Sequence, residues 1–386
     1  MDKVINLKKC NEVTKESYSS KYRTKMGFAH SEKRQWLTAV IMYILFCVIM
    51  DLRLHYRMQN YSVRVMNNAS EAIYVSNIIP CDLDPLCVVT IKGLTLDYIN
   101  FYILGPLAGL TEKLMRLSQS TWVSPNLISV THVLVAIVAG QLISRKSLMH
   151  RRLGVVAFQV RSWLDDLDGF VARQIHHIYG EHSDVGSTGY FVDAICDTLG
   201  TAALLIGIFI YLKNNMPKYS GYMKLEPILP VAGSQVGSCV VQKKKIRHIR
   251  VIPTILLVTG ELIISSALWN RYIDLYQNLL ESDNLSVSIT QQELFTKQTQ
   301  VLRQNSLLIT TTLWRLINPH ALTDYLLAAV FVDRLWSYMH SIRWIGYIFI
   351  FVVVYYTEFQ YMQSSRFIME MGTPVVSEIN ANSTVS

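Results

Sequence analysis

Two short acidic runs hold the residues best suited to chemistry, and each run adjoins a long apolar stretch. Within each run two aspartates lie three or four residues apart, so that on a helix both carboxylates share one face. A carboxylate without a counter-charge costs at least about 2.5 kcal/mol inside a membrane. Several carboxylates that converge there need a cation, which predicts a metal site. The aspartates are Asp165, Asp168, Asp193 and Asp197.

The neighbours of these aspartates indicate the substrate. Carboxylate oxygens select Mg²⁺, Mn²⁺ or Ca²⁺ rather than Zn²⁺, and two divalent ions roughly 3.5–4 Å apart are common in phosphoryl chemistry. Gly169 and Gly189 flank the carboxylates and let a ligand approach closely. Arg173 offers planar donors that suit a phosphate. Together they predict a pyrophosphate substrate. In the alternative interpretation, the glycines serve helix packing and Arg173 only marks a helix end.

The composition is that of a membrane protein. The chain is 51% hydrophobic and only 17% charged, whereas soluble domains are about a quarter charged. Several apolar runs approach the roughly 20 residues that cross a bilayer as a helix. We therefore predict an all-α polytopic membrane protein with seven spans. They lie near 36–53, 126–144, 153–173, 188–212, 251–270, 307–332 and 343–362.

The distribution of basic residues predicts the orientation. Lys and Arg concentrate in residues 1–35, 145–152 and 243–250, and are absent from 174–187. By the positive-inside rule the N-terminus is cytosolic, so that seven spans leave the C-terminus in a lumen. All four glycosylation sequons then fall on the luminal side, where Cys81 and Cys87 could form a disulfide. The sequons begin at Asn60, Asn68, Asn284 and Asn382.

This topology divides the chain into segments. Because the first apolar run follows a long polar stretch and lacks a clear cleavage site, we read it as a retained anchor and not as a signal peptide. The basic loop 213–250 is better explained as an orientation signal than as a nucleic-acid patch, and no nucleic acid is expected as a partner. The expected segments are a cytosolic one at 1–35, the anchor at 36–53, a luminal one at 54–97, a core at 98–362 that opens with an interfacial stretch at 98–121, and a luminal tail at 363–386.

The acidic pattern resembles the signature of the CDP-alcohol phosphotransferases. That signature reads Asp-x-x-Asp-Gly-x-x-Ala-Arg, followed by Gly-x-x-x-Asp-x-x-x-Asp, and it matches from Asp165 to Asp197. The stretch from Trp122 through Pro125 and Asn126 also resembles the family's entry into its first core helix. The similarity covers about 98–362. It implies a six-helix core in which the hydroxyl of a lipid acceptor attacks the β-phosphate of a CDP-linked headgroup and releases CMP.

The resemblance also implies roles for single residues. Asp165, Asp168 and Asp193 would hold two ions, Mn²⁺ or Mg²⁺. Asp197 would deprotonate the acceptor hydroxyl and could also touch a metal. A homodimer is expected on the same ground. The residues implied to contact the CDP moiety are Gly169, Ala172 and Gly189 around cytidine and Arg173 at phosphate.

The chain departs from the family pattern in two places, and these departures bear on the expected substrate and orientation. The segment 174–188 is longer than in the family and rich in His, so it could form a lid, contact the acceptor, or be a solvated loop. The additional N-terminal span inverts the core and turns its site toward the lumen of the Golgi or the endoplasmic reticulum. In this architecture the chain resembles the insect-type enzymes that join CDP-ethanolamine to ceramide. The histidines and acids of the insertion are His176, His177, Glu181, His182 and Asp184.

Two alternative functions remain open. The first is transfer of ethanolamine phosphate or choline phosphate to diacylglycerol, which motif chemistry does not distinguish from transfer to ceramide. The second is transport of divalent cations, which predicts acidic sites through the whole membrane thickness. The carboxylates instead cluster near one end of the predicted helices, which disfavours transport.

Other polar residues in the apolar runs could contact substrate. Glu261 and Asp324 lie within predicted helices, and Asn126 lies at the entry to one. Asp324 also belongs to a polar group around Pro319, which could instead hold together a helix broken by that proline. The other members of that group are Arg315, Asn318 and His320.

Overall fold

The computed structural model describes residues 37–61, 89–120, 122–176, 188–215, 251–282 and 290–369. All regular structure in these ranges is helical, which confirms the predicted all-α class. The chain divides into two units, Met1–Gln59 and Asn60–Ser386. The sequons at Asn68, Asn284 and Asn382, both cysteines of the expected disulfide and most of the 174–188 insertion lie outside the described residues.

The described part of the first unit is one long apolar helix. It runs from Leu37 to Asn60, on the border of the second unit, and it is apolar enough to cross a membrane. The helix extends past residue 53, where we predicted the anchor to end, so that the sequon residue Asn60 lies at its C-terminal end.

Four helices of the second unit also have the length and composition of membrane spans. They are α4 (Pro125–Ile143), α6 (Thr188–Asn215), α7 (Val251–Leu280) and α11 (Leu335–Met369). With the N-terminal helix, the described residues hold five candidate spans, which confirms a polytopic membrane protein. Helices α7 and α11 end later than the predicted spans at 270 and 362, and α11 takes in the first residues of the expected tail.

The two remaining predicted spans differ from expectation. Helix α5 (Leu148–Ile175) is long, but it is too charged to count as a span by composition, and it turns Arg161 and Asp168 into the protein interior. The predicted span 307–332 is two helices, α9 (Asn305–Ile317) and α10 (Pro319–Phe331), that are separated at Asn318. Each of their 13 residues adds about 1.5 Å, so neither alone covers a hydrocarbon core about 30 Å thick.

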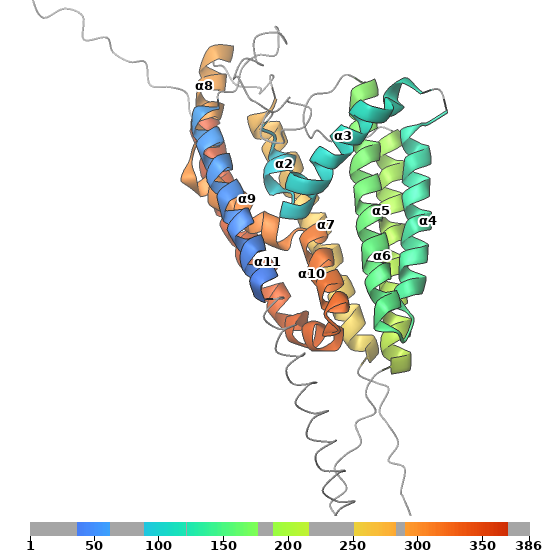
Figure 1. Cartoon of the computed structure of the whole chain (residues 1–386). Helices are drawn as coiled ribbons and strands as arrows, with labels where there is room; N and C mark the ends of the chain where they lie inside the picture. The colour runs from blue at the N-terminus through green and yellow to red at the C-terminus, as the bar shows by residue number, and fades with distance from the viewer. Residues whose placement is uncertain are drawn as a thin grey trace, which may run out of the picture. The chain divides into compact units, whose positions relative to one another are not determined.

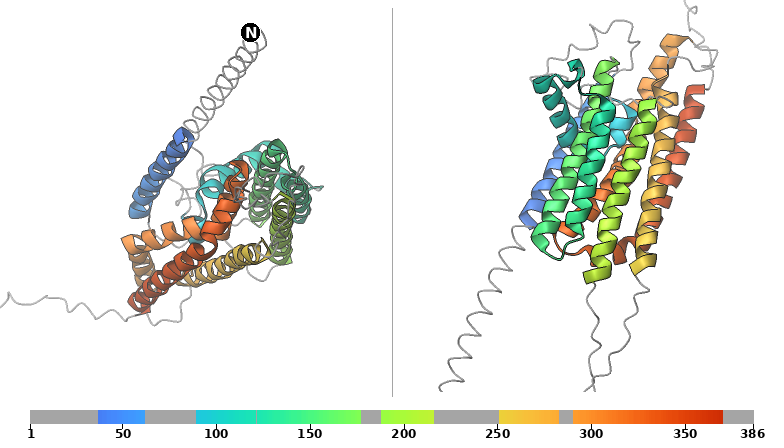
Figure 2. Two further views of the ribbon diagram at one scale, coloured as in Figure 1. Left: turned by 90° about the horizontal axis from the view of Figure 1, so that it is seen from below. Right: turned by 90° about the vertical axis from the view of Figure 1, so that its right-hand side faces the viewer.

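Helix α4 packs against both α5 and α6, and the three helices form one group (Figures 1 and 2). The helix begins at Pro125, where the Ser124 hydroxyl accepts a hydrogen bond from the Leu127 amide. Small residues bring α4 and α6 into backbone contact: a Cβ added at Gly207 would lie 2.3 Å from the Gly140 carbonyl oxygen. This contact fixes which face of α4 meets α5 and α6.

Helices α9 and α10 pack against α11, and with α7 and α11 they form the centre of a second group. The short α2 (Ile91–Thr95) packs against α7 and α9, and α8 (Gln291–Leu302) packs against α7 and α11. Between α2 and α4 the chain forms a π-helix at Asn100–Leu104, α3 (Gly105–Met115) and a 3₁₀ turn at Leu117–Gln119. Helix α3 lies against α5 and exposes Leu107, Leu110 and Leu114, as an amphipathic segment would.

The break between α9 and α10 is held by side chains. Arg315 is 1% exposed and donates from Nε to the Leu94 carbonyl oxygen (2.8 Å) and from Nη1 to the Tyr102 hydroxyl (2.8 Å). Asn318 donates to the Thr95 carbonyl oxygen (2.9 Å) and accepts from the first turn of α10. For Arg315 and Asn318 the structure therefore supports the interpretation in which they stabilise a broken helix.

Substituting Gly207→Ala should destabilise the α4–α6 contact by about 1–3 kcal/mol, because the added methyl group meets backbone that cannot move aside. Gly260→Ala is the matched control, since its Cβ meets only the Tyr347 hydroxyl at the tip of a side chain. Thermal unfolding in detergent would measure both. Equal stability of the two variants would contradict the close contact.

Candidate metal centre

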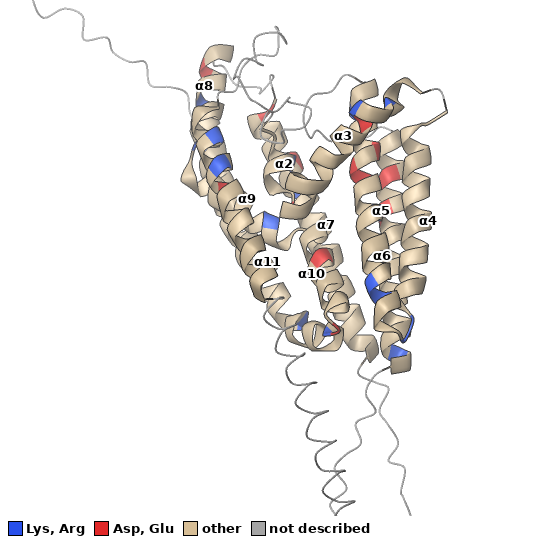
Figure 3. Cartoon of the chain, viewed as in Figure 1, with Lys and Arg blue, Asp and Glu red and all other residues tan. Residues whose placement is uncertain are grey.

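The structure brings the two acidic runs to one end of the α4–α5–α6 group. Asp165 and Asp168 lie in the second half of α5, and Asp193 and Asp197 lie in the second and third turns of α6. Figure 3 shows the acidic residues, coloured red, in the upper halves of these helices. The start of α5 and the end of α6 carry basic residues at the opposite end.

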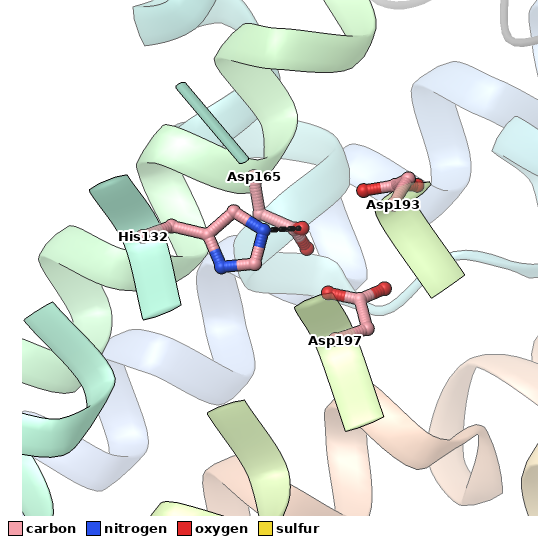
Figure 4. A group of neighbouring side chains, drawn as sticks. All are labelled: His132, Asp165, Asp193 and Asp197. Atoms are coloured by element: carbon pink, nitrogen blue, oxygen red, sulfur yellow. Dashed lines mark ion pairs between the residues drawn. The ribbon is translucent and has the colours of Figure 1, made fainter. Parts of the chain in front are cut away.

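A histidine from α4 completes the cluster. Ligand atoms of His132, Asp165, Asp193 and Asp197 all lie within 4.8 Å of one another, so the four residues could hold a metal ion. Figure 4 shows His132 directed toward Asp165, with the two carboxylates of α6 beside them. The His132 Nε2 atom lies 3.5 Å from Oδ1 of Asp165. Three helices therefore contribute to the centre, where the sequence had predicted two.

Asp168 lies at the edge of this cluster. The Ser129 hydroxyl on α4 donates to its Oδ2 atom at 2.6 Å, and His132 Nε2 lies 3.8 Å from the same oxygen. Asp168 is buried, yet it is not one of the four residues with ligand atoms within the common 4.8 Å. Of the predicted metal ligands, Asp168 is thus the one that accepts a hydrogen bond from the Ser129 hydroxyl of α4.

Arg161 supplies a positive charge inside the cluster. Its side chain is 5% exposed, and it donates to Asp165 (3.4 Å) on its own helix and to Asp197 on α6. The guanidinium fits against Gly200, where an added Cβ would lie 3.1 Å from its Nε atom. Arg161 therefore ties α5 to α6 at the level of the carboxylates and offsets part of their negative charge.

The remaining atoms of the cluster fit a divalent cation. Asp165 Oδ1, Asp193 Oδ1 and both ring nitrogens of His132 are buried and make no hydrogen bond within the described residues. Leaving such groups unpaired costs about 1–3 kcal/mol each. An ion bound among them would satisfy these atoms and offset their charge. The His132 and aspartate side chains could therefore hold a metal ion.

The residues expected to contact the CDP moiety lie near the cluster. Arg173 extends over Gly169, where an added Cβ would meet its Nη1 atom at 3.1 Å. Arg173 also acts electrostatically on Asp193, as Lys92 of α2 does. Ala172 is partly buried on α5, and Gly189 is exposed in the first turn of α6.

None of the three residues suggested as further substrate contacts belongs to the group of four possible metal ligands. Asn126 is exposed in the first turn of α4. Glu261 is buried on α7 against Gly346, where an added Cβ would overlap its carboxylate. Asp324 on α10 accepts a hydrogen bond from Gln159 of α5 at 2.7 Å, so it connects the two helix groups.

Sequence reasoning missed three residues of the site, Ser129, His132 and Arg161. Two signals pointed to them. Ser129 and His132 are three residues apart on an otherwise apolar helix, and Arg161 lies four residues before Asp165, on the same face of α5. An ionisable group in such a helix generally faces the interior or a functional site.

Comparison with known proteins identifies the family. The model of the ceramide phosphoethanolamine synthase family matches residues 28–371. A ceramide phosphoethanolamine synthase of Drosophila melanogaster is 41% identical over 292 residues, which cover 75% of this chain and 72% of the relative. The chain belongs to the ceramide phosphoethanolamine synthase family. No solved structure matches it.

Membership of the ceramide phosphoethanolamine synthase family confirms the predicted resemblance and the prediction of a phosphotransferase. The match begins at residue 28, ahead of the N-terminal helix, and ends at 371, just past α11. The helix that we read as a retained anchor is thus part of the family's pattern, together with the α4–α5–α6 centre.

Replacing Arg161 with Met should lower the stability of the metal-free protein by up to about 3 kcal/mol, because two carboxylates lose their shared counter-charge. Added Mg²⁺ or Mn²⁺ should restore most of the lost stability, since the ion supplies positive charge at the same place. Thermal unfolding with a chelator and with added ion would measure both effects.

The control for this variant is Arg271→Met. Arg271 pairs with Glu358 where both side chains are largely exposed, at 49% and 39%, and such pairs contribute about 0–1 kcal/mol. If Arg161→Met were as stable in chelator as Arg271→Met, the counter-charge role of Arg161 would be wrong.

Proposed function

We propose that this protein transfers phosphoethanolamine from CDP-ethanolamine to the primary hydroxyl of ceramide at the α4–α5–α6 centre, releasing CMP. The observation that carries the proposal is the cluster of ligand atoms within 4.8 Å, in a chain matched over 28–371 by the ceramide phosphoethanolamine synthase family. The family supports the choice of donor and acceptor. The cluster supports the position of the reaction.

The carboxylates of Asp165, Asp168, Asp193 and Asp197 would hold the divalent cations, which we expect to be two ions of Mn²⁺ or Mg²⁺. Ions bound there would neutralise the pyrophosphate and stabilise CMP as it leaves. One buried oxygen each of Asp165 and Asp193 supports this assignment, because these oxygens make no hydrogen bond within the described residues.

Asp197 is the carboxylate best placed to accept the proton of the acceptor. Its side chain is 37% exposed, compared with 12% for Asp165 and 5% for Asp168. As the ceramide oxygen bonds to the β-phosphorus, the phosphorus–oxygen bond to CMP breaks and the hydroxyl proton passes to the carboxylate. The hydrogen bond from Arg161 would orient this carboxylate toward the acceptor.

The nucleotide would lie along the end of α5 beside the start of α6. Gly169, Ala172 and Gly189 present little side-chain bulk there, and Arg173 would donate to phosphate from its position over Gly169. The positive charges of Lys92 and Arg173 act on the same acidic cluster and would favour a pyrophosphate beside it.

We further propose that the centre faces the lumen of the Golgi or the endoplasmic reticulum, with the N-terminus cytosolic, and that the protein is a homodimer. The charge pattern and the four sequons of the sequence support the orientation. The homodimer rests on the resemblance to the wider phosphotransferase family alone.

Substituting Asp197→Asn should reduce synthesis of ceramide phosphoethanolamine by about 10²–10⁴-fold, because an amide keeps the shape of the side chain but cannot accept the proton. Purified protein would receive Mn²⁺, CDP-ethanolamine and either ceramide or diacylglycerol, and released CMP and lipid product would be measured. Asp274→Asn is the control, since this exposed aspartate lies on α7 outside the metal group.

The outcomes of this assay separate the candidate functions. Product from ceramide that is lost only in Asp197→Asn supports the proposal. Product from diacylglycerol alone would show that the acceptor is diacylglycerol and not ceramide. Absence of CMP release with either lipid would contradict CDP-ethanolamine as the donor.

The proposed orientation predicts N-glycans on luminal sequons. Asn68→Gln and Asn284→Gln should each remove one glycan, so that each variant migrates faster on a gel than the unsubstituted protein. Treatment with peptide N-glycosidase should abolish this difference. Ala232→Asn creates a sequon with Gly233 and Ser234 in the loop expected to be cytosolic, and it should remain unmodified. A glycan at position 232 would contradict the orientation.

A further inference from the structure

His132 is the most completely buried ionisable group of the centre. Its side chain is 0% exposed on α4, in an environment of three acidic side chains. Neither ring nitrogen makes a hydrogen bond within the described residues. The wider family signature, which begins at Asp165, gives no role to a residue of this helix.

The distances around His132 disfavour a simple hydrogen-bonding role. Its Nε2 atom lies 3.5 Å from Asp165 and 3.8 Å from Asp168, beyond or at the limit of a good N–H···O bond. The Asp168 oxygen nearest to it already accepts from Ser129. The imidazole is therefore near several carboxylates without being bonded to any of them, an arrangement in which an ion can lie between nitrogen and oxygen.

We propose that Nε2 of His132 binds a divalent cation of this centre together with Asp165, Asp193 and Asp197, giving one nitrogen and three carboxylate ligands. The proposal rests on the proposed function and adds a ligand to its metal site. It also explains why Asp168, engaged by Ser129, lies outside the group of atoms that can meet at one ion.

The packing of α4 supports a ligand role, because a ligand must be held in place. On the inward face of α4, His132 is followed by Ala136, Ala139 and Gly140, all buried against neighbouring helices. The Gly140 and Gly207 backbones are in contact, which leaves α4 no room to rotate or slide against α6. The imidazole is thus presented to the carboxylates by a rigid helix.

A nitrogen ligand has a consequence for the choice of ion. Mg²⁺ binds almost wholly through oxygen and demands regular octahedral geometry, whereas Mn²⁺ is a transition metal that also accepts imidazole. Removing the imidazole should therefore weaken Mn²⁺ binding more than Mg²⁺ binding.

The test uses Mn²⁺ alone as a spectroscopic probe. Detergent-solubilised full-length protein with one equivalent of Mn²⁺ should show a ¹⁴N coupling from a directly bound imidazole in pulsed electron paramagnetic resonance. Protein made with ¹⁵N-labelled histidine should show the ¹⁵N coupling in its place. This comparison needs no variant, so it is independent of any effect of substitution on folding.

Two variants then assign the nitrogen to one residue. His132→Gln should lose the coupling and raise the Kd for Mn²⁺ by about tenfold or more. His340→Gln should keep the nitrogen coupling and leave the Kd for Mn²⁺ unchanged, because this exposed histidine lies on α11 beside Trp336. Thermal unfolding in chelator would confirm that both variants are folded.

Each outcome decides the proposal. Coupling that changes with the isotope and disappears in His132→Gln supports it. Bound Mn²⁺ without nitrogen coupling, or coupling that persists in His132→Gln, overturns it and leaves the proposed function standing if ceramide phosphoethanolamine is still made. Absence of Mn²⁺ binding by the unsubstituted protein also overturns it, and the proposed function is then decided by whether ceramide phosphoethanolamine is made.

Discussion

The rest of the structure depends on holding several carboxylates close together within an apolar helix bundle. Such an arrangement is unfavourable unless each negative charge meets a cation or a donor. The protein meets this constraint in three ways: Arg161 pairs with Asp165 and Asp197, Ser129 donates to Asp168, and the oxygens that remain unpaired are gathered where one ion can bind them. The demand for positive charge that destabilises the empty cluster is the same property that would let it bind a metal ion.

Close packing of small residues makes this arrangement geometrically possible. Helices α5 and α6 each lie against α4, and the contact of Gly140 with Gly207 brings backbone to backbone. In a membrane, where lipid tails are as apolar as Leu, such close contacts are a main source of helix association. The same contact orients α4 so that Ser129 and His132 face the aspartates, and in this way stability and function share one interface.

The second helix group contains a helix that is interrupted at Asn318, and polar contacts stabilise this break within an apolar protein. Unpaired backbone groups at the break between α9 and α10 would be costly. Asn318 caps the start of α10 and also binds the carbonyl of Thr95, while Arg315 binds two further groups of the α2 region. Asp324 then connects α10 to α5 through Gln159. The two groups are thus joined by a partly buried polar contact as well as by apolar packing.

The sequence by itself determined the features that are local. Hydrophobic runs fixed the all-helical membrane class, and the spacing of Asp165, Asp168, Asp193 and Asp197 fixed which faces of two helices are acidic, because side-chain direction along a helix follows from residue spacing alone. The sequence also carried the family resemblance, which the comparisons confirm. Only the tertiary structure decided that α4 is the third helix to contribute side chains to the centre and that His132 and Arg161 join the aspartates. It also decided that 307–332 is two helices. These features depend on which helices pack together and at what height, and that choice is made by contacts between residues far apart in the chain.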